Sequence, residues 1–435
     1  MSSNPAVAAA VVGPRWTVVG GGPCGIGAVG RLLDRNCQVT WVDPAFRVGR
    51  MGKHYAHVPA NTNNRDFMAA FQLNSSFDYV ENEQRRLAQG KTAMSTLKDL
   101  ECYDLGLYVD TFTDFVDILS RRVTAIQGSV IDLYSSDVGS YCTWQVTVKS
   151  YDGAATTVHE ADAVILCTGS CPILPPPSLI PSADFGLTGI CQHNLDEMVC
   201  PQHCNDLFNV RDAGSDLNVL SRDVPWAVIG SSHSAMLIVK NLCEAGVRNI
   251  VNFYRSELRF MHAAPDGSMI YPGIGLKGPV GAWVESNLMC LDTDHPIVKR
   301  VQSQVAISWD EQMKLHNVGH VVAAVGFRRD EDSLPVVRVA DRCLSTCDLD
   351  GYDRRTGKIP TGSAPDSCRG PVLFGLGIAF PQDIIDGAGN VQPWVGLKRS
   401  IKQTDVMVDE YCTAVATSLS AAATIPTQFC MYPSC

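Results

Sequence analysis

The chain has 435 residues, a formal net charge of −10, 46% hydrophobic residues and 18% charged residues. A chain of this length can form two or three domains with full cores. Its negative net charge argues against nucleic acid or an anionic membrane as the main partner. No stretch of about 18 consecutive apolar residues occurs, so no membrane-spanning helix is expected.

The cysteines and the amino-terminal residues bear on the cellular compartment. Seventeen cysteines are scattered through the chain, an odd number, and several occupy positions typical of a core, such as Cys167. The first residues, Met-Ser-Ser-Asn-Pro, lack the basic start and cleavage pattern of a secretory signal. We therefore expect reduced cysteines and a cytoplasmic location.

The first informative feature along the chain is a glycine-rich turn at residues 20–25, Gly-Gly-Gly-Pro-Cys-Gly. It follows an apolar strand that begins at Trp16, and an amphipathic helix over residues 26–36 follows it. This order directs backbone N–H groups and the positive end of a helix at a pyrophosphate. Residues 1–15, before the strand, are expected to form a flexible tail.

The context of this turn strengthens the prediction of a dinucleotide site. The next strand, residues 38–43, ends in Asp43, whose carboxylate can accept hydrogen bonds from the ribose hydroxyls of an adenosine. Gly20 permits the tight turn, Gly22 lets the pyrophosphate approach, and Gly25 lets the helix pack on the strand. A glycine turn without a ligand is the alternative. We predict that this part of the chain binds FAD through Gly20, Gly22, Pro23, Cys24, Gly25 and Asp43.

The residues between this unit and the middle of the chain predict helices and then a meander of strands. The expected helices are 66–73, 77–89 and 111–122, and the expected strands are 123–134, 143–149, 156–159 and 163–167. Residues 171–177 are proline-rich and indicate a stiff linker. Residues 180–221 are polar and carry no clear pattern.

A second turn of the same kind follows the apolar strand 226–229 and precedes a helix over 234–245. It departs from the glycine pattern at Ser232 and at Ala235, where alanine is tolerated if the helix lies slightly further from the strand. The next strand ends in Arg255 instead of an acid, and an arginine suits a 2′-phosphate through paired hydrogen bonds. This favours NADPH over NADH, and the alternative is a degenerate domain that binds nothing. The predicted contacts are Gly230, Ser232, Ser234, Ala235 and Arg255.

These patterns together resemble the flavoproteins with two dinucleotide-binding domains, and the resemblance covers most of the chain. This superfamily includes the flavin-containing and N-hydroxylating monooxygenases and the pyridine nucleotide-disulfide oxidoreductases. Besides the two turns, the resemblance rests on the stretches 163–169 and 321–327, which look like the strands where such chains pass between domains. By this similarity Thr168 and Gly169 contact the flavin.

Two features resemble the monooxygenases more closely. Asn61 lies in a loop where those enzymes place an asparagine beside the reactive face of the flavin, and by that similarity it would contact a flavin peroxide. Asparagine is also common in ordinary turns. The second turn, Gly-Ser-Ser-His-Ser-Ala, likewise resembles their NADPH turn more than that of the disulfide reductases.

Other features depart from the family patterns. The disulfide reductases carry a cysteine pair against the flavin, and none lies near residues 45–65 or 140–170. The Gly-Asp pair that holds the ribityl chain is replaced by Gly377-Ile378, with Asp383 or Asp386 as substitutes. A helix over 395–416, beginning near Val395, would direct its N–H groups towards the flavin.

Two groups of cysteine and histidine residues could in principle bind a metal ion or take part in redox chemistry. Cys191, His193, Cys200, His203 and Cys204 lie in a short span, but their spacing matches no common zinc finger, so no metal site is predicted. Cys430 and Cys435 form a C-x4-C pair on a flexible tail at 417–435, without an adjoining basic residue to activate a thiol.

The sequence therefore predicts an α/β protein with two Rossmann-like, three-layer ββα domains, the NAD(P)H-binding domain (222–326) inserted in the FAD-binding domain (16–221 and 327–416). We expect an FAD-dependent oxidoreductase that is reduced by NADPH and uses oxygen to hydroxylate a small organic substrate through a flavin peroxide. The alternatives are a disulfide or thiol reductase that uses the tail cysteines, and a non-catalytic redox sensor. The substrate stays open, and so does the oligomeric state, including a homodimer.

Overall fold

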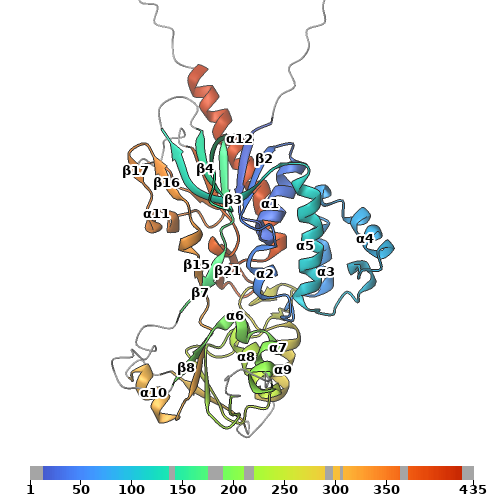
Figure 1. Ribbon diagram of the computed structural model, residues 1–435, viewed down its shortest axis with the longest axis vertical. Helices are drawn as coiled ribbons and strands as arrows, with labels where there is room; N and C mark the ends of the chain where they lie inside the picture. Colours follow the sequence, from blue (N-terminus) through green and yellow to red (C-terminus); the bar gives the residue numbers. More distant parts are fainter. Residues whose placement is uncertain are drawn as a thin grey trace, which may run out of the picture.

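The computed structural model describes residues 13–136, 143–174, 190–209, 220–289, 297–303, 307–362 and 371–423. These residues form two α/β units, drawn one above the other in Figure 1. In the first unit, a ten-stranded sheet has the order β17-β16-β3-β2-β1-β6-β19-β18, and β4 and β5 extend it from β3. Its strands are β1 (Arg15–Val19), β2 (Gln38–Asp43), β3 (Thr124–Ser135), β4 (Trp144–Ser150), β5 (Thr156–Ala161), β6 (Ala163–Leu166), β16 (Val336–Val339), β17 (Arg342–Cys343), β18 (Lys358–Ile359) and β19 (Val372–Gly375).

Helices cover one face of this sheet and a strand meander covers the other. The helices on the first face are α1 (Pro23–Asp34), α2 (Gly49–His54), α3 (Asn64–Phe71), α4 (Tyr79–Ala88), α5 (Leu105–Ser120) and α12 (Leu397–Ala423), whereas α11 (Thr346–Asp350) packs on the other face through Leu349. On the helical face, Trp16 of β1 stacks on Phe374 and meets the edge of Tyr411 in α12. On the opposite face, Trp144 and Val146 of β4 pack against the sheet. The predicted three-layer ββα arrangement is confirmed.

The second unit has a five-stranded parallel sheet with the order β13-β10-β9-β14-β8. Its strands are β8 (Cys191–His193), β9 (Trp226–Ile229), β10 (Ile250–Tyr254), β13 (Val298–Gln302) and β14 (His320–Ala323), and its helices are α6 (Leu195–Met198), α7 (Pro201–Asn209), α8 (His233–Glu244), α9 (Gly278–Val284) and α10 (Trp309–Leu315). One face packs against α7 and α8, and the other packs against α10. All five strands lie between residues 191 and 323, so this unit is inserted in the first.

Short antiparallel pairs complete the structure. The pair β7 (Ser170–Pro172) and β15 (Phe327–Arg329) carries the chain between the two units, as Figure 1 shows. The other pairs are β11 (His262–Ala263) with β12 (Met269–Ile270), and β20 (Gln382–Ile385) with β21 (Val391–Trp394). Edge strand β8 precedes residue 222, where the sequence places the start of the NAD(P)H-binding domain, so the second sheet takes in an earlier part of the chain.

The register of the two sheets positions the turns. Val19 of β1 lies opposite Val42 of β2 and Leu166 of β6, so the carboxyl ends of these strands meet at one edge. In the second sheet, Ile229 of β9 lies opposite Phe253 of β10 and Ala323 of β14. Each glycine turn therefore starts where the strand order reverses, which is where open α/β sheets bind ligands.

No helix in the described part of the chain is long and apolar enough to cross a membrane.

Candidate functional site

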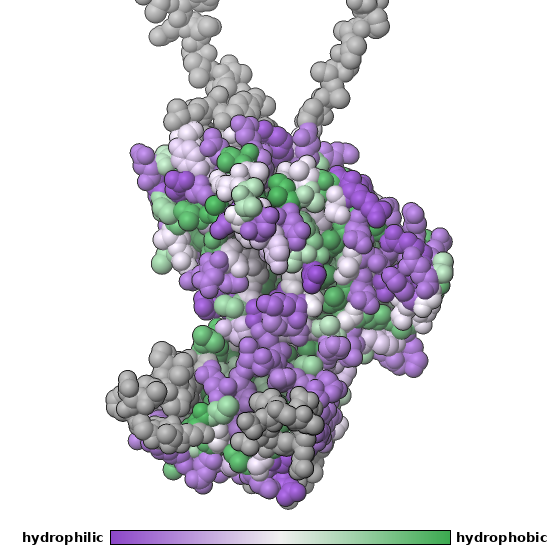
Figure 2. Space-filling view, in the orientation of Figure 1, coloured by the Kyte–Doolittle hydropathy of each residue, from purple (hydrophilic) through white to green (hydrophobic). Residues whose placement is uncertain are grey.

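A cavity of about 1340 Å³ extends from the first glycine turn to the start of α8 in the second unit. It exceeds the roughly 300–1,000 Å³ that is usual for small-molecule sites. Hydrophilic side chains gather at the junction of the units on the face drawn in Figure 2. The predicted site residues that line this cavity are Gly20, Gly22, Pro23, Cys24, Gly25, Asp43, Thr168, Gly169, Ser234, Gly377 and Val395.

Gly20, Gly22 and Gly25 of the first turn differ in their surroundings. Gly20 has φ +114°, and a Cβ there would lie 2.3 Å from the carbonyl oxygen of Cys167. A Cβ on Gly25 would lie 2.0 Å from the carbonyl oxygen of Gly20, whereas a Cβ on Gly22 would meet no atom of the described residues within 4 Å. Side chains at positions 20 and 25 would therefore collide with the backbone, so Gly20 and Gly25 let the turn pack closely on the protein. Gly22 instead borders open space on the cavity side.

Asp43 is buried and forms part of the cavity wall. Its Oδ2 accepts a hydrogen bond from the backbone N–H of Gly21 at 2.6 Å, and its Oδ1 accepts from Ala45 at 2.8 Å and Phe46 at 2.5 Å. An ionised carboxylate has about four acceptor sites. Three backbone donors therefore leave one site on Oδ2 without a partner among the described residues.

The second turn repeats the geometry of the first. Gly230 has φ +128°, and a Cβ there would lie 2.3 Å from the carbonyl oxygen of Ala324. Ser232 is the N-cap of α8, and its side chain makes no capping hydrogen bond. Ala235 is fully buried beside Gly230. The turn thus places the amino end of α8 at the cavity, with Ser234 in the lining.

Two buried polar atoms at the cavity lack a hydrogen-bond partner within the described chain. They are Oγ1 of Thr168, after β6, and Nδ1 of His233, the first residue of α8. Burial, with a smaller effect of the Lys277 charge, lowers the pKa of His233 to about 4, so the ring is neutral at neutral pH. Buried polar atoms are nearly always paired in proteins. These two atoms and the open space at Gly22 fit a bound dinucleotide.

Several predicted site residues do not line the cavity: Asn61, Gly230, Ser232, Ala235 and Arg255. The backbone of Asn61 faces the position of a Cβ on Gly278, and its Oδ1 accepts a hydrogen bond from Thr62 at 3.3 Å. Arg255 is exposed directly after β10. The roles of Asn61 and Arg255 stay predictions.

The carboxyl-terminal lining comes from two short segments. Gly377 has φ +84°, and a Cβ there would lie 2.7 Å from Sγ of Cys24, so this loop packs against the first turn. Val395 and Leu397 bring the amino end of α12 to the cavity. Asp383 and Asp386 lie in and just after β20, outside the lining, so the geometry brings neither suggested substitute to the cavity.

The loop and helix at residues 47–55, which the sequence did not predict as part of the site, contribute Arg50 and Tyr55 to the cavity. Both side chains bind Asp196 of α6: Arg50 in an ion pair and Tyr55 through a hydrogen bond of 2.5 Å. A basic cluster directly after the acid of β2 was a signal that could have indicated these residues. The contacts of Arg50 and Tyr55 with Asp196 join the first unit to the second at the cavity wall.

A family model described as FAD-NAD(P)-binding matches residues 17–171. Monooxygenase AgnR1 of Paecilomyces divaricatus is 28% identical over 419 residues, which cover 88% of this chain and 94% of that protein. Among solved structures, the bacillithiol disulfide reductase of Staphylococcus aureus aligns with a TM-score of 0.50 at 12% identity, covering 93% of this chain and 98% of that chain. The ornithine N-hydroxylase of Kutzneria sp. 744 aligns with a TM-score of 0.49 at 13% identity, covering 92% and 99% of the two chains.

Proposed function

We propose that the chain is a monooxygenase among the flavin-dependent oxidoreductases with two dinucleotide-binding domains. It takes electrons from NADPH and uses oxygen to hydroxylate a small organic substrate. One observation carries this proposal: a single cavity reaches from the first glycine turn to the amino end of α8. The similarity to a monooxygenase over nearly the whole chain supports the reaction type.

The residues of the cavity divide into two sets by what they would hold. In the first unit, Gly22 admits a pyrophosphate, Asp43 accepts from a ribose, and Thr168 offers an unpaired hydroxyl. In the second unit, Ser234 and the neutral His233 lie at the amino end of α8, where a helix favours negative charge.

When bound, the flavin supplies the two-electron transfer from the nicotinamide and the activation of oxygen. The chain positions the two cofactors, because one cavity between two linked sheets holds both of them in a fixed orientation relative to each other. The chain also keeps water from parts of the cavity, because Leu376 and Val58 line it with buried apolar side chains.

The test uses the purified holoprotein. NADPH is first mixed with it without oxygen and the flavin absorbance is followed; ¹⁸O₂ is then added with a panel of amines, sulfides, ketones and phenols. We expect rapid bleaching by NADPH and one ¹⁸O atom in the product of one class. Release of all the oxygen as hydrogen peroxide with every substrate, or failure of NADPH to bleach the flavin, would contradict the proposal.

Thiol titration of the same reduced sample distinguishes a disulfide reductase. A gain of two thiols after NADPH addition, abolished in Cys430→Ser, would favour the reductase over the monooxygenase. Cys430 and Cys435 lie outside the residues that the structure describes.

A further inference from the structure

Three metal-ligating side chains meet in the second unit, away from the cavity. Cys191 and His193 are the first and last residues of edge strand β8, and His320 is the first residue of β14. Cys191 lies opposite His320 in the parallel ladder. Because alternate residues of a strand share a face, the register places all three side chains on one face of the sheet.

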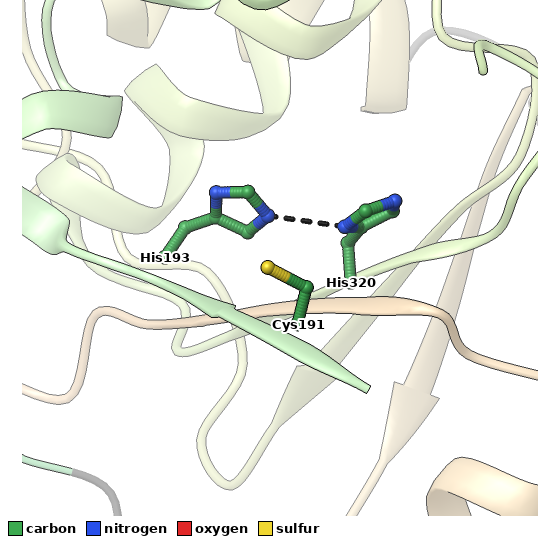
Figure 3. Close-up of side chains that lie close together, drawn as sticks. All are labelled: Cys191, His193 and His320. Carbon is green, nitrogen blue, oxygen red and sulfur yellow. Dashed lines mark hydrogen bonds between the residues drawn. The ribbon is translucent and has the colours of Figure 1, made fainter. Parts of the chain in front are cut away.

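The three side chains point toward one another, as Figure 3 shows. The distance between Nε2 of His193 and Nδ1 of His320 is 3.1 Å. One ring nitrogen of each histidine and Sγ of Cys191 all lie within 4.8 Å of one another. In a tetrahedral zinc site with Zn–N of about 2.0–2.1 Å and Zn–S of about 2.3 Å, ligand atoms lie roughly 3.3–3.6 Å apart. Cys191 is exposed, so its side chain has room to move toward the two rings.

The surroundings hold both imidazoles in place. Each ring stacks on Trp226 of β9, with centroid distances of 4.4 Å for His193 and 4.5 Å for His320. Trp226 itself is fully buried.

We propose that Cys191, His193 and His320 form a zinc-binding site with a fourth position open to solvent. One thiolate and two imidazoles form a set of ligands that suits Zn²⁺. Cys191 is exposed whereas His320 is buried, so the site opens at the edge of the sheet. The metal would fasten edge strand β8 to β14.

This site is separate from the proposed cofactor cavity. None of its three ligands lines that cavity. Cys191 and His320 begin their strands, whereas the glycine turn follows the carboxyl end of β9 in the same parallel sheet. Zinc binding is therefore testable independently of the oxidoreductase reaction.

The test titrates the metal-free holoprotein with Zn²⁺ by competition with a chromogenic chelator, and zinc X-ray absorption reports the ligands. We expect a site of one sulfur and two imidazoles in the wild type. Cys191→Ser and His193→Gln should each weaken this site by about a hundredfold or more, because loss of a ligand costs more than the 10–100-fold typical of outer-shell changes. The matched control is Cys343→Ser, which removes an exposed cysteine from the first unit and should leave zinc binding unchanged.

The melting temperature reports whether the metal stabilises the folded protein by binding at β8. Zinc should raise the melting temperature of the wild type and of Cys343→Ser, but not that of Cys191→Ser, because only a ligand that binds the folded state stabilises it. Equal zinc affinity in the wild type and both ligand variants, no zinc binding to the wild type, or a bound zinc without sulfur would each overturn the proposal. Flavin absorbance of each variant confirms that it has folded.

Discussion

Gly20 and Gly22 lie two residues apart in the first turn and have different neighbours. A side chain at Gly20 would meet the carbonyl oxygen of Cys167 in a backbone conformation with φ +114° that L-residues rarely adopt. Gly22 has φ −75°, which any residue adopts, and no atom in the described part of the chain lies within 4 Å of its added Cβ. The fold therefore requires glycine at position 20, whereas the contacts of the described protein do not require it at position 22.

Alanine at each position separates these roles. Gly20→Ala should destabilise the apoprotein by about 1–3 kcal/mol through backbone strain alone, and the close contact adds to this cost. Gly22→Ala should leave the melting temperature of the apoprotein unchanged but weaken FAD binding by about tenfold, since a methyl group there occupies the approach to the pyrophosphate. Thermal denaturation and flavin fluorescence titration measure both. Unchanged FAD affinity in Gly22→Ala would contradict the proposed cofactor position.

Arg255 is proposed to select the nicotinamide cofactor because it directly follows β10. Arg255→Ala should raise the KM for NADPH by about ten- to a hundredfold, corresponding to roughly 1.5–3 kcal/mol for hydrogen bonds to a charged group, with little change in the KM for NADH. The matched control is Arg248→Ala, an exposed arginine that precedes β10 and pairs with Asp223. Equal effects of Arg255→Ala on both cofactors would remove the argument for NADPH.

At the scale of an element, the β20–β21 hairpin depends on one carboxylate. Asp386 accepts hydrogen bonds from the backbone N–H of Tyr271, Ala388 and Asn390, and from the side chain of Gln392. Loss of water raises its pKa, but the hydrogen bonds, led by those from Asn390, outweigh this and lower the pKa to about 2. The carboxylate therefore fixes the hairpin turn and its contact with residue 271.

This lowered pKa predicts a dependence of stability on pH. The contribution of Asp386 is fully present above its ordinary pKa of 3.8 and is lost as the pH falls toward 2. Asp386→Asn should lower the melting temperature at pH 6, and the difference from the wild type should shrink between pH 4 and pH 2. Asp383→Asn, on the same hairpin and half-exposed beside Arg354, is the control with a smaller effect. A difference that stays constant with pH would contradict this account.

At the scale of the whole molecule, the two units are linked beside the cavity by Asp196. Its side chain is 2% exposed and binds Arg50 and Tyr55, which belong to the first unit. A buried charge that loses its partner is costly. This link therefore couples the alignment of the units to the stability of the protein.

Arg50→Met tests this coupling by removing the opposite charge while keeping a long side chain. We expect a loss of about 3–5 kcal/mol of stability and slower flavin reduction at saturating NADPH, because the units are less well aligned. Asp196→Asn combined with Arg50→Met should recover part of the stability, since no buried charge remains. Unfolding in urea and stopped-flow absorbance measure the two effects. An Arg50→Met protein as stable as the wild type would show that the ion pair contributes nothing.

Local patterns in the sequence predicted the parts of the fold that neighbours along the chain decide. Strand 38–43 has the predicted bounds, and the helices after both glycine turns begin within a few residues of the expected positions. Strand β8 and helices α6 and α7 were not predicted. These elements are short: pairing with β14 defines the exposed edge strand β8, and burial against the second sheet defines α6 and α7 more than their own residue pattern does.

By itself, the sequence determined the two strand–turn–helix units and the acid at the end of β2, because tight turns and periodic burial depend on nearby residues. Only the tertiary structure decided which side chains from distant segments meet. It brought His320 to His193 across 127 residues and beside Cys191, put His233 into the cavity wall, and left Asn61 outside the lining. Such contacts depend on strand order and register, which no local pattern specifies.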